Sequence, residues 1–584
     1  MPHPHSSTPI DAKTLKRRIR VALGREPGDL LLRGGKVVNV FTKRVVTANV
    51  VIADGWIAGV GPYDWNATET VELSGESILP GLIDAHMHLE STLLLPSELA
   101  KLVVPHGTSA IVADPHEIAN VLGIPGIELL IQTGRGLPLD LLFMAPSCVP
   151  ACEWESSGEV LGTEEISKLL RHPDVLGLAE MMNFPGVLGT QEEVLAKVCE
   201  ALQLGVPIDG HAPGLSGQSL IGYAAAGIRS DHESTTAEEA IAKADLGMLV
   251  QVRNGSSARN LEALLPAIVE NRLGHWCLAT DDIHVDDLMD CGHLDSMLRR
   301  IVAAGVPAAT AVRHASWIPA NHYGLANRGA LSPGYVADLF IVDDLVGFVG
   351  HSTIKGGRIV AKRGELVASP ANTTASYENT INIGALDETA FTLRPSPDSC
   401  PVIGIIPNEI VTKRETCAVH VDPSTHVWKF DPSEDIAMVA CIERHHATGR
   451  VGVGLVRGFD FSTHGAIGSS VAHDAHNLVI AGTNPSDMRR CALELSGMGG
   501  GFVVVENGQV LARLPLRVAG LMSDQDYLTV RTQLDKVTQA ARSLGCRLHA
   551  PFGTLSFLSL SVIPELRITD RGMFDVLKQK ILTP

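Results

Sequence analysis

The stretch SILPGLIDAHMH, residues 77–88, joins a hydrophobic run to an acidic residue and two histidines. On a β-strand, residues i and i+2 point to the same face, so His86 and His88 can bind one metal ion together. A histidine pair with this spacing is a weak signal by itself. The hydrophobic run with Asp84 strengthens it, because it predicts a strand that carries both rings to its carboxyl end. We therefore interpret this stretch as a strand that leads into a metal site.

Seven later runs have the same character, and each ends in polar or metal-binding residues. They are GTSAIVADPH (107–116), DLLFMAPSCV (140–149), VLGLAEM (175–181), VPIDGHAP (206–213), GIRSDHE (227–233), GMLVQVR (247–253) and HWCLATDD (275–282). Helix-like stretches separate them. Eight strands in roughly 250 residues match a (β/α)8 barrel, which carries its chemistry at the carboxyl ends of its strands. The sequence therefore predicts an α/β fold with a TIM-like barrel over residues 80–328.

The flanks of this segment look different. Short strand-like runs with glycine turns fill residues 26–79 and return at 329–370, which predicts one β-sandwich domain built from both flanks. Gly34-Gly35 and Asp54-Gly55 stand where tight hairpin turns are expected. Residues 1–25 predict an N-terminal arm with one short helix. After a linker at about 368–395, residues 395–584 predict an additional α+β domain, in which the glycine-rich stretch 497–501 indicates a turn or a close backbone approach.

Composition narrows the function classes. The 584 residues are 45% hydrophobic and 19% charged, which excludes a disordered chain. The formal net charge of −18 argues against a nucleic-acid partner, though not against a single nucleobase as substrate. No run approaches the ~20 apolar residues that span a bilayer, and the N-terminus lacks an apolar export segment. The ten cysteines form no CxxC pair, which indicates reduced thiols. We expect a cytoplasmic protein without a membrane partner.

Further ligand candidates stand at the ends of later strands. They are Glu180, His211, His232 and Asp281. Each alone is more often a solvated loop residue, but a barrel gathers the ends of its strands onto one ring. Together with His86 and His88 they predict a metal site.

The ligand types indicate the kind of site. Imidazoles and carboxylates without thiolates suit Zn, Mn or Fe and argue against a purely structural zinc. Six ligands are too many for one tetrahedral ion, so we expect two divalent ions with Glu180 between them and a shared hydroxide. Asp281 could orient that hydroxide and accept its proton.

Several motifs resemble the amidohydrolase superfamily, and specifically its adenine deaminase family. They are PGLIDAHMHLES, VADPHE, AEMMNFPG, DGHAPGL, SDHES and ATDD, in the same order as in that family. The stretches GAIGSSVAHDAHNLVIAGTN (465–484) and ALELSGMGGGFVVVENGQV (492–510) resemble the C-terminal domain of adenine deaminases. The resemblance therefore covers nearly the whole chain after about residue 25.

The resemblance implies a fold, a ligand set and a reaction. It implies a pair of Mn or Fe ions, with Zn possible, bound by the residues His86, His88, Glu180, His211, His232 and Asp281. Glu180 stands where many amidohydrolases have a carboxylated lysine, as it does in adenine deaminases. The implied reaction is hydrolysis of adenine to hypoxanthine and ammonia, by attack of hydroxide on C6. Ring nitrogen N1 must gain a proton, and we take Glu233 as the first candidate donor and Glu90 as the second.

For several other polar residues, the sequence allows either a structural or a substrate-binding role. Ser91, His116 and Glu117 either line the base pocket or cap loops. The cluster His473, Asp474, His476 and Asn477 either forms a hydrogen-bonded turn or closes over the barrel mouth and contacts the substrate. Our functional hypothesis assigns Glu90, Ser91, His116, His473 and Asp474 to substrate binding.

Three alternatives stand beside this interpretation. A related amidohydrolase could act on another aminopurine, on a cyclic amide or on an amino-sugar phosphate, although cyclic-amide hydrolases are expected to carry the lysine bridge. A single-zinc deaminase would fit His88-Leu89-Glu90 but needs P-C-x-x-C, whereas Cys148 and Cys152 are spaced as CxxxC. A catalytically inactive barrel scaffold should have lost ligands. A homodimer is expected only because symmetric dimers are the commonest oligomers.

Overall fold

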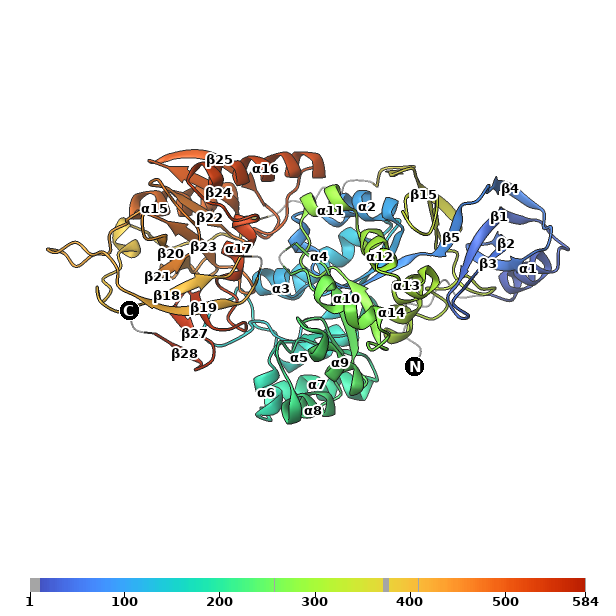
Figure 1. Cartoon of the computed structure of the whole chain (residues 1–584), viewed down its shortest axis with the longest axis horizontal. Helices are drawn as coiled ribbons and strands as arrows, with labels where there is room; N and C mark the ends of the chain where they lie inside the picture. The colour runs from blue at the N-terminus through green and yellow to red at the C-terminus, as the bar shows by residue number, and fades with distance from the viewer. Residues whose placement is uncertain (1–10, 257, 371–377, 408, 583–584) are drawn as a thin grey trace.

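The computed structural model describes residues 11–256, 258–370, 378–407 and 409–582. Three bodies follow one another along the long axis of the molecule (Figure 1). A β-rich body built by both ends of the first 370 residues lies at one end, and the C-terminal sheet lies at the other. Parallel strands and their helices lie between them.

All eight predicted central runs contain β-strands. Five form a parallel sheet in chain order: β6 (Leu82–Met87), β7 (Thr108–Ala113), β8 (Asp140–Ala145), β9 (Val175–Met181) and β10 (Ile208–Gly210). Three form a second parallel sheet: β11 (Ser230–Asp231), β12 (Leu249–Arg253) and β13 (Trp276–Ala279). Both sheets are buried on their two faces, as parallel strands covered by helices usually are.

Main-chain hydrogen bonds connect the two parallel sheets at both junctions. The Arg229 N–H, just before β11, donates to the Ile208 carbonyl of β10 at 3.1 Å. The Asp281 N–H, just after β13, donates to the His86 carbonyl of β6 at 2.9 Å. Alternate residues such as Ile83 and Ala85 pack together inside the curl. The strands therefore form a curled parallel sheet whose carboxyl ends face one side.

Helices cover the outside of the curled sheet. They are α2 (Pro96–Val103), α3 (His116–Leu122), α4 (Ile124–Gly134), α5 (Thr163–Leu170), α6 (Phe184–Leu188), α7 (Glu192–Leu204), α8 (Gly217–Ala225), α9 (Ala237–Asp245), α10 (Leu261–Val269), α11 (Val285–Cys291), α12 (Leu294–Ala303), α13 (Ala308–His314) and α14 (Trp317–His322). The start of α9 follows simple capping rules. Thr236 accepts a hydrogen bond from the Glu239 N–H at 3.2 Å, and two glutamates stand in the first turn.

The β-rich body combines strands from both flanks of the central segment. Its strands are β1 (Gly28–Asn39), β2 (Arg44–Ala53), β3 (Trp56–Gly61), β4 (Ala67–Glu72), β5 (Ser77–Pro80), β14 (Leu339–Val342), β15 (Gly350–Lys355), β16 (Arg358–Lys362) and β17 (Glu365–Leu366). They form one nine-stranded sheet, in which β14 pairs antiparallel with β5. The helix α1 (Ala12–Ala22) packs against β2 and β3. The body is therefore one continuous sheet and not two separate sheets.

One of the two predicted hairpin turns is wrong. Asp54 and Gly55 do join β2 to β3, with φ of 51° and 79°. Gly34 and Gly35 instead form a bulge inside β1, where the pairing with β2 shifts register. A Cβ atom on Gly35 would lie 2.6 Å from the Ile78 side chain of β5. The glycines therefore let β1 bend and pair first with β4 and then with β5, so the strand continues where a turn was expected.

The C-terminal body contains an eight-stranded sheet in the order β19-β18-β21-β20-β23-β22-β24-β25. Its strands are β18 (Cys400–Ile405), β19 (Thr412–Cys417), β20 (Ile436–Ile442), β21 (Val451–Arg457), β22 (Ala466–Ser469), β23 (Leu478–Gly482), β24 (Gly501–Glu506) and β25 (Gln509–Pro515). The helices α15 (Pro485–Met498), α16 (Tyr527–Ser543) and α17 (Pro551–Phe557) and the small sheet β26 (Leu566–Thr569), β27 (Gly572–Asp575) and β28 (Lys580–Ile581) complete it. A hydrogen bond of 2.8 Å from the Ser523 N–H to the Leu93 carbonyl attaches it to the central body. Among the described residues, the helices are all too short or too polar to cross a bilayer.

The glycine-rich stretch 497–501 leaves the end of α15 and finishes in a close backbone approach, one of the two structures expected for it. Gly501 has φ of +132°, and a Cβ atom there would lie 1.9 Å from the Leu514 carbonyl oxygen. Gly497 lies in α15, and a Cβ atom there would have no atom within 4 Å. A side chain therefore fits at Gly497 but not at Gly501.

We expect Gly501→Ala to lower the free energy of unfolding by about 3 kcal/mol or more, because its Cβ atom overlaps backbone in a conformation that disfavours L-residues. The matched control Gly497→Ala should raise it by about 0.5–1 kcal/mol, because alanine is the better helix residue. Denaturant unfolding of both variants measures the difference. Equal stability of the two variants would contradict this backbone geometry.

Candidate active site

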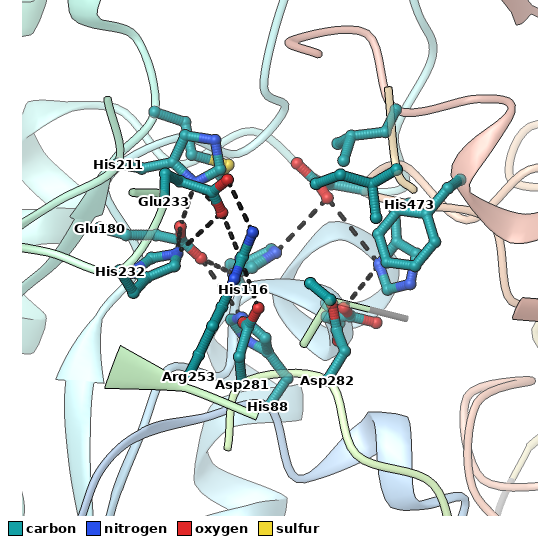
Figure 2. Close-up of a pocket in the computed structure, with 17 residues that line it drawn as sticks. His88, His116, Glu180, His211, His232, Glu233, Arg253, Asp281, Asp282 and His473 are labelled. Carbon is teal, nitrogen blue, oxygen red and sulfur yellow. Dashed lines mark hydrogen bonds and ion pairs between the residues drawn. The ribbon is translucent and has the colours of Figure 1, made fainter. Parts of the chain in front are cut away.

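All six predicted metal ligands lie at the carboxyl ends of the parallel strands. His86 lies in β6 and Glu180 in β9, whereas the others follow their strands by one or two residues. Figure 2 shows Glu180, His211 and His232 together on one side of the pocket, with His88 and Asp281 below them. All six side chains are buried. The convergence that the spacing predicts is therefore present.

Glu180 lies between two pairs of histidines. Its Oε1 atom is 3.4 Å from His88 Nε2 and 3.8 Å from His86 Nε2. Its Oε2 atom is 2.7 Å from His211 Nδ1 and 3.2 Å from His232 Nε2. Each carboxylate oxygen therefore faces a different pair of imidazoles, as a carboxylate shared by two cations would.

Asp281 completes the half of the site that contains His86 and His88. Its Oδ1 atom lies 3.1 Å from His88 Nε2 and 3.5 Å from His86 Nε2. The backbone at Asp281 has φ of +62°, a conformation that aspartate tolerates better than most residues. Its N–H and its carbonyl pair with His86 and His88 on either side of Met87. The left-handed backbone and these bonds aim the carboxylate at the two rings.

Charge in this cluster is balanced between acids and bases. Burial disfavours ionised Glu180, but His232 and His211 outweigh it and hold the pKa of Glu180 well below its usual range. Burial likewise disfavours ionised Asp281, and Arg253 and the histidines lower its pKa. The carboxylate of Glu180 raises the pKa of His232 despite burial. The site therefore favours positive charge next to ionised carboxylates.

The donor atoms fit divalent cations. Among the buried groups whose ligand atoms all lie within 4.8 Å of one another, three consist of predicted ligands and Glu233: His86, His88 and Asp281; His86, Glu180 and His232; and His211, His232 and Glu233. The Nδ1 atom of His88 lies 3.1 Å from the Asp114 carbonyl oxygen, which directs Nε2 into the cluster. Imidazoles and carboxylates without thiolates are donors that divalent transition metals accept.

Two further residues, neither of them a predicted site residue, lie in the cluster. Arg253 ends β12, and its guanidinium bonds Asp281 Oδ2 at 2.6 Å and Glu233 Oε2 at 2.9 Å. Its position at a strand end was visible in the sequence, but arginine is not a metal ligand. Asp114, after β7, belongs to a fourth donor group with His88, His116 and Glu180. Both residues could have been predicted from the sequence, because each stands at the carboxyl end of a predicted strand.

Arg253 determines the state of Glu233. Burial raises the pKa of Glu233, but Arg253 and the histidines outweigh it and lower this pKa well below the usual range. Glu233 also lies 3.3 Å from His232 Nε2 through its Oε1 atom. The residue that we expected to be a proton donor is thus an ionised carboxylate in the resting site.

The structure separates the predicted substrate-binding residues into two sets. His116, His473 and Asp474 line the pocket, whereas Glu90 and Ser91 do not. Ser91 donates a hydrogen bond to Asp282, which does line the pocket. Glu90 accepts one from the Ile118 N–H at 3.0 Å, at the start of α3. Glu90 and Ser91 therefore lie behind the residues that line the pocket.

The HDAHN segment, residues 473–477, is both a turn and a wall of the pocket. The His476 N–H closes the turn onto the Ala472 carbonyl at 2.7 Å. His473 Nδ1 lies 2.7 Å from Glu117 Oε1, and His476 Nε2 lies 3.0 Å from Glu117 Oε2. Glu117 stands in the first turn of α3, so this contact attaches the C-terminal body to the central one. The hydrogen-bonded turn is therefore present and its residues His473 and Asp474 line the pocket, whereas contact of the segment with a substrate stays a prediction.

The C-terminal body also supplies apolar lining residues. Ile410, Phe557 and Leu560 line the pocket, and the Phe557 ring stacks on His473 with centroids 4.5 Å apart. In Figure 2, His473 faces Glu180 and His211 across the pocket. No sequence signal distinguished these apolar residues from ordinary core residues.

Comparison with known proteins agrees with this geometry. The amidohydrolase family matches residues 77–360, and the adenine deaminase C-terminal domain matches residues 409–580. The chain is 43% identical over 567 residues to adenine deaminase 2 of Carboxydothermus hydrogenoformans, covering 97% of this chain and 98% of the relative. It is 44% identical to the adenine deaminase of Methanothrix thermoacetophila, covering 96% and 97%, and 42% identical to that of Desulfatibacillum aliphaticivorans, again covering 96% and 97%.

The contact between His473 and Glu117 predicts a pH dependence of stability. Burial disfavours the imidazolium form, but Glu117 and Asp282 outweigh it and raise the pKa of His473 to about 9. A group whose pKa is raised on folding stabilises fully below its unfolded pKa of about 6.5 and loses that effect as pH rises through 9. Wild type should therefore exceed Glu117→Gln in Tm most below pH 6.5, and the difference should shrink towards pH 9.5.

Thermal unfolding at half-unit pH steps checks this expectation. Glu164→Gln is the matched control, because it breaks an exposed ion pair with Lys168 at 2.9 Å. Its Tm should stay within a degree or so of wild type, since exposed pairs contribute about 0–1 kcal/mol. A constant Tm difference between wild type and Glu117→Gln at every pH would rule out the ionised contact.

Proposed function

The chain belongs to the adenine deaminase family of amidohydrolases, and on this premise we propose that it hydrolyses adenine to hypoxanthine and ammonia. The observation that carries the proposal is Glu180, whose two carboxylate oxygens face two separate pairs of histidines. The resemblance to adenine deaminases implies a glutamate at this position, where many amidohydrolases have a carboxylated lysine. The C-terminal body matches the adenine deaminase C-terminal domain and lines the same pocket, which supports adenine rather than a cyclic amide as the substrate.

We propose that two divalent ions, Mn or Fe with Zn as a further possibility, are held in the two halves of the site. His86, His88 and Asp281 would hold one ion, His211 and His232 the other, and Glu180 would contact both. When bound, such ions lower the pKa of a coordinated water so that hydroxide is available near neutral pH. The remaining chemistry depends on side chains of this chain.

Asp281 and Glu233 would move the protons. Asp281 has one oxygen towards His88 and the other held by Arg253, so its carboxylate has a fixed direction. Hydrolysis adds water oxygen to C6, places one proton on N1 and gives the other to the leaving amino group. Glu233, ionised in the resting site, would accept a water proton and pass it to N1. Asp281 would take the hydroxyl proton of the tetrahedral intermediate to N6, so that ammonia leaves.

The C-terminal residues would exclude water and hold the base. The pocket is small, with a cavity volume of about 30 Å³, and His473 and Phe557 line it. These two rings would pack against the ring of a bound base. Asp474 and His116, 3.6 Å apart through Oδ1 and Nε2, would offer polar contacts to the ring edge.

The proposal extends to the domain boundaries, the cellular compartment and the partners of the chain. We infer that the curled sheet is a complete (β/α)8 barrel over 80–328, with the flank domain at 26–79 and 329–370, the arm at 1–25 and the C-terminal domain at 395–584. The first ten residues of that arm lie outside the described residues. The net charge of −18 supports an enzyme without a nucleic-acid partner. A cytoplasmic location without a membrane partner stays part of the proposal. A homodimer stays a prediction.

An ammonia-release screen tests the substrate. Mn-loaded protein should release ammonia from adenine in preference to guanine, cytosine and adenosine, and should open no cyclic amide. Glu180→Gln should lose both metal and activity, because the amide cannot serve two cations as a carboxylate does. Ring opening of a hydantoin without ammonia release from any aminopurine would overturn the assignment.

The role of Glu233 has its own test. Glu233→Gln should lower kcat by about 10²–10⁴-fold, the usual contribution of a positioned proton carrier, while two metal equivalents stay bound. The matched control is Glu238→Gln, whose side chain is exposed at the start of α9. Kinetics and metal analysis of each purified variant give the result. Near-normal kcat with both metals present would remove Glu233 from the mechanism.

A further inference from the structure

We propose that the buried pair Asp231–Lys243 is a clamp that positions one half of the metal site, the half with His211 and His232. The inference rests on the proposed metal site and concerns residues that make no contact with the pocket. Asp231 immediately precedes His232, and Lys243 lies in α9, whose residues 237–245 cover this part of the curled sheet. Both side chains are 0% exposed.

The Asp231 carboxylate connects the backbones of the two histidine loops. Its Oδ1 atom accepts a hydrogen bond from the Ala212 N–H at 3.0 Å, directly after His211. Its Oδ2 atom accepts from the Glu233 N–H at 3.1 Å, directly after His232, and from the Ser234 hydroxyl at 3.0 Å. With Lys243 as the fourth donor, the carboxylate accepts four hydrogen bonds from this part of the chain.

Lys243 fixes the clamp from the outside. Its ammonium donates to Asp231 Oδ2 at 2.7 Å, to the Ala212 carbonyl at 2.9 Å and to Glu239 Oε1 at 2.8 Å. These three acceptors match its three N–H donors. The Ala212 peptide is thus held through its N–H by Asp231 and through its carbonyl by Lys243. Such bonds leave little freedom to the main chain that carries His211.

The other half of the site has a separate clamp without a lysine. The Asp84 carboxylate accepts hydrogen bonds from the Thr280 N–H at 3.1 Å and the His86 N–H at 3.3 Å. It also accepts from the Thr280 hydroxyl at 2.6 Å and lies 3.0 Å from His293 Nε2. It therefore connects the strand of His86 to the residue before Asp281. Each half of the site has its own buried carboxylate, and the two clamps share no residue.

This separation predicts a selective defect. Loss of Lys243 leaves Asp231 as a buried carboxylate without its cation, so the loops of His211 and His232 should loosen while His86, His88 and Asp281 keep their support. Removing such outer contacts of metal ligands typically weakens metal affinity 10–100-fold. If Lys243 had only a structural role, its loss would lower the free energy of unfolding but would not weaken one metal equivalent more than the other.

Titration of the metal-free, full-length protein with Mn²⁺ alone tests the clamp. Wild type should bind two equivalents and give the electron paramagnetic resonance signal of two coupled Mn²⁺ ions. Lys243→Met should bind one equivalent within about threefold of wild type and the other 10–100-fold more weakly, with an uncoupled signal at one equivalent. Asp231→Asn, which keeps the side-chain shape, should weaken the same equivalent if Lys243→Met fails to fold.

Two matched variants complete the test. Lys355→Met removes a lysine of β15 in the β-rich body, which pairs with Asp338 at 2.7 Å, and should retain both equivalents. Asp84→Asn should weaken the equivalent that Lys243→Met leaves intact. The clamp is wrong if Lys243→Met and Asp231→Asn bind both equivalents as wild type does, or weaken both equally. If wild type itself bound no Mn²⁺, the proposed metal site would fail, and this inference would fail with it.

Discussion

The structure depends on one buried carboxylate, that of Glu180, placed between two pairs of imidazoles. An ionised group out of water is costly unless partners surround it. Here the partners come from three other strand ends, so the carboxylate is stable only where a curled parallel sheet brings those ends together. Divalent cations between the oxygens and the rings would satisfy the same arrangement. The fold and the site therefore both require that these strand ends converge around Glu180.

A frame of buried polar groups holds this centre. Arg253 directs Asp281 and keeps Glu233 ionised, and the carboxylates Asp84 and Asp231 bind the main chain beside the ligands. Buried groups of this kind have value only when they are fully paired, because a single missing partner leaves a desolvated charge. The network thus connects the predicted ligands to the main chain around them, and such preorganisation favours catalysis on a small substrate.

The C-terminal body completes the pocket from the opposite side. Glu117 on α3 binds both histidines of the HDAHN segment, and Phe557 stacks on one of them. The central strands provide the charged donors and the C-terminal body provides much of the apolar wall. A pocket for a flat nucleobase needs both kinds of surface. The resemblance of both regions to one family agrees with this division of roles.

The amino-acid pattern alone predicts the eight central strands and the convergence of the six candidate ligands, because hydrophobic runs that end in His, Asp or Glu are local patterns with a direct geometric meaning. Tertiary contacts set the rest: the pairing of these six side chains, the ion pair of Arg253 with Glu233, the position of Glu90 and Ser91 behind the pocket, and the bend of a strand at Gly34 and Gly35. These outcomes depend on contacts between residues far apart in the chain, where an apolar or charged residue gives no local sign of its partner. Phe557 is the plainest case, since a phenylalanine has the same pattern in a core and on a pocket wall.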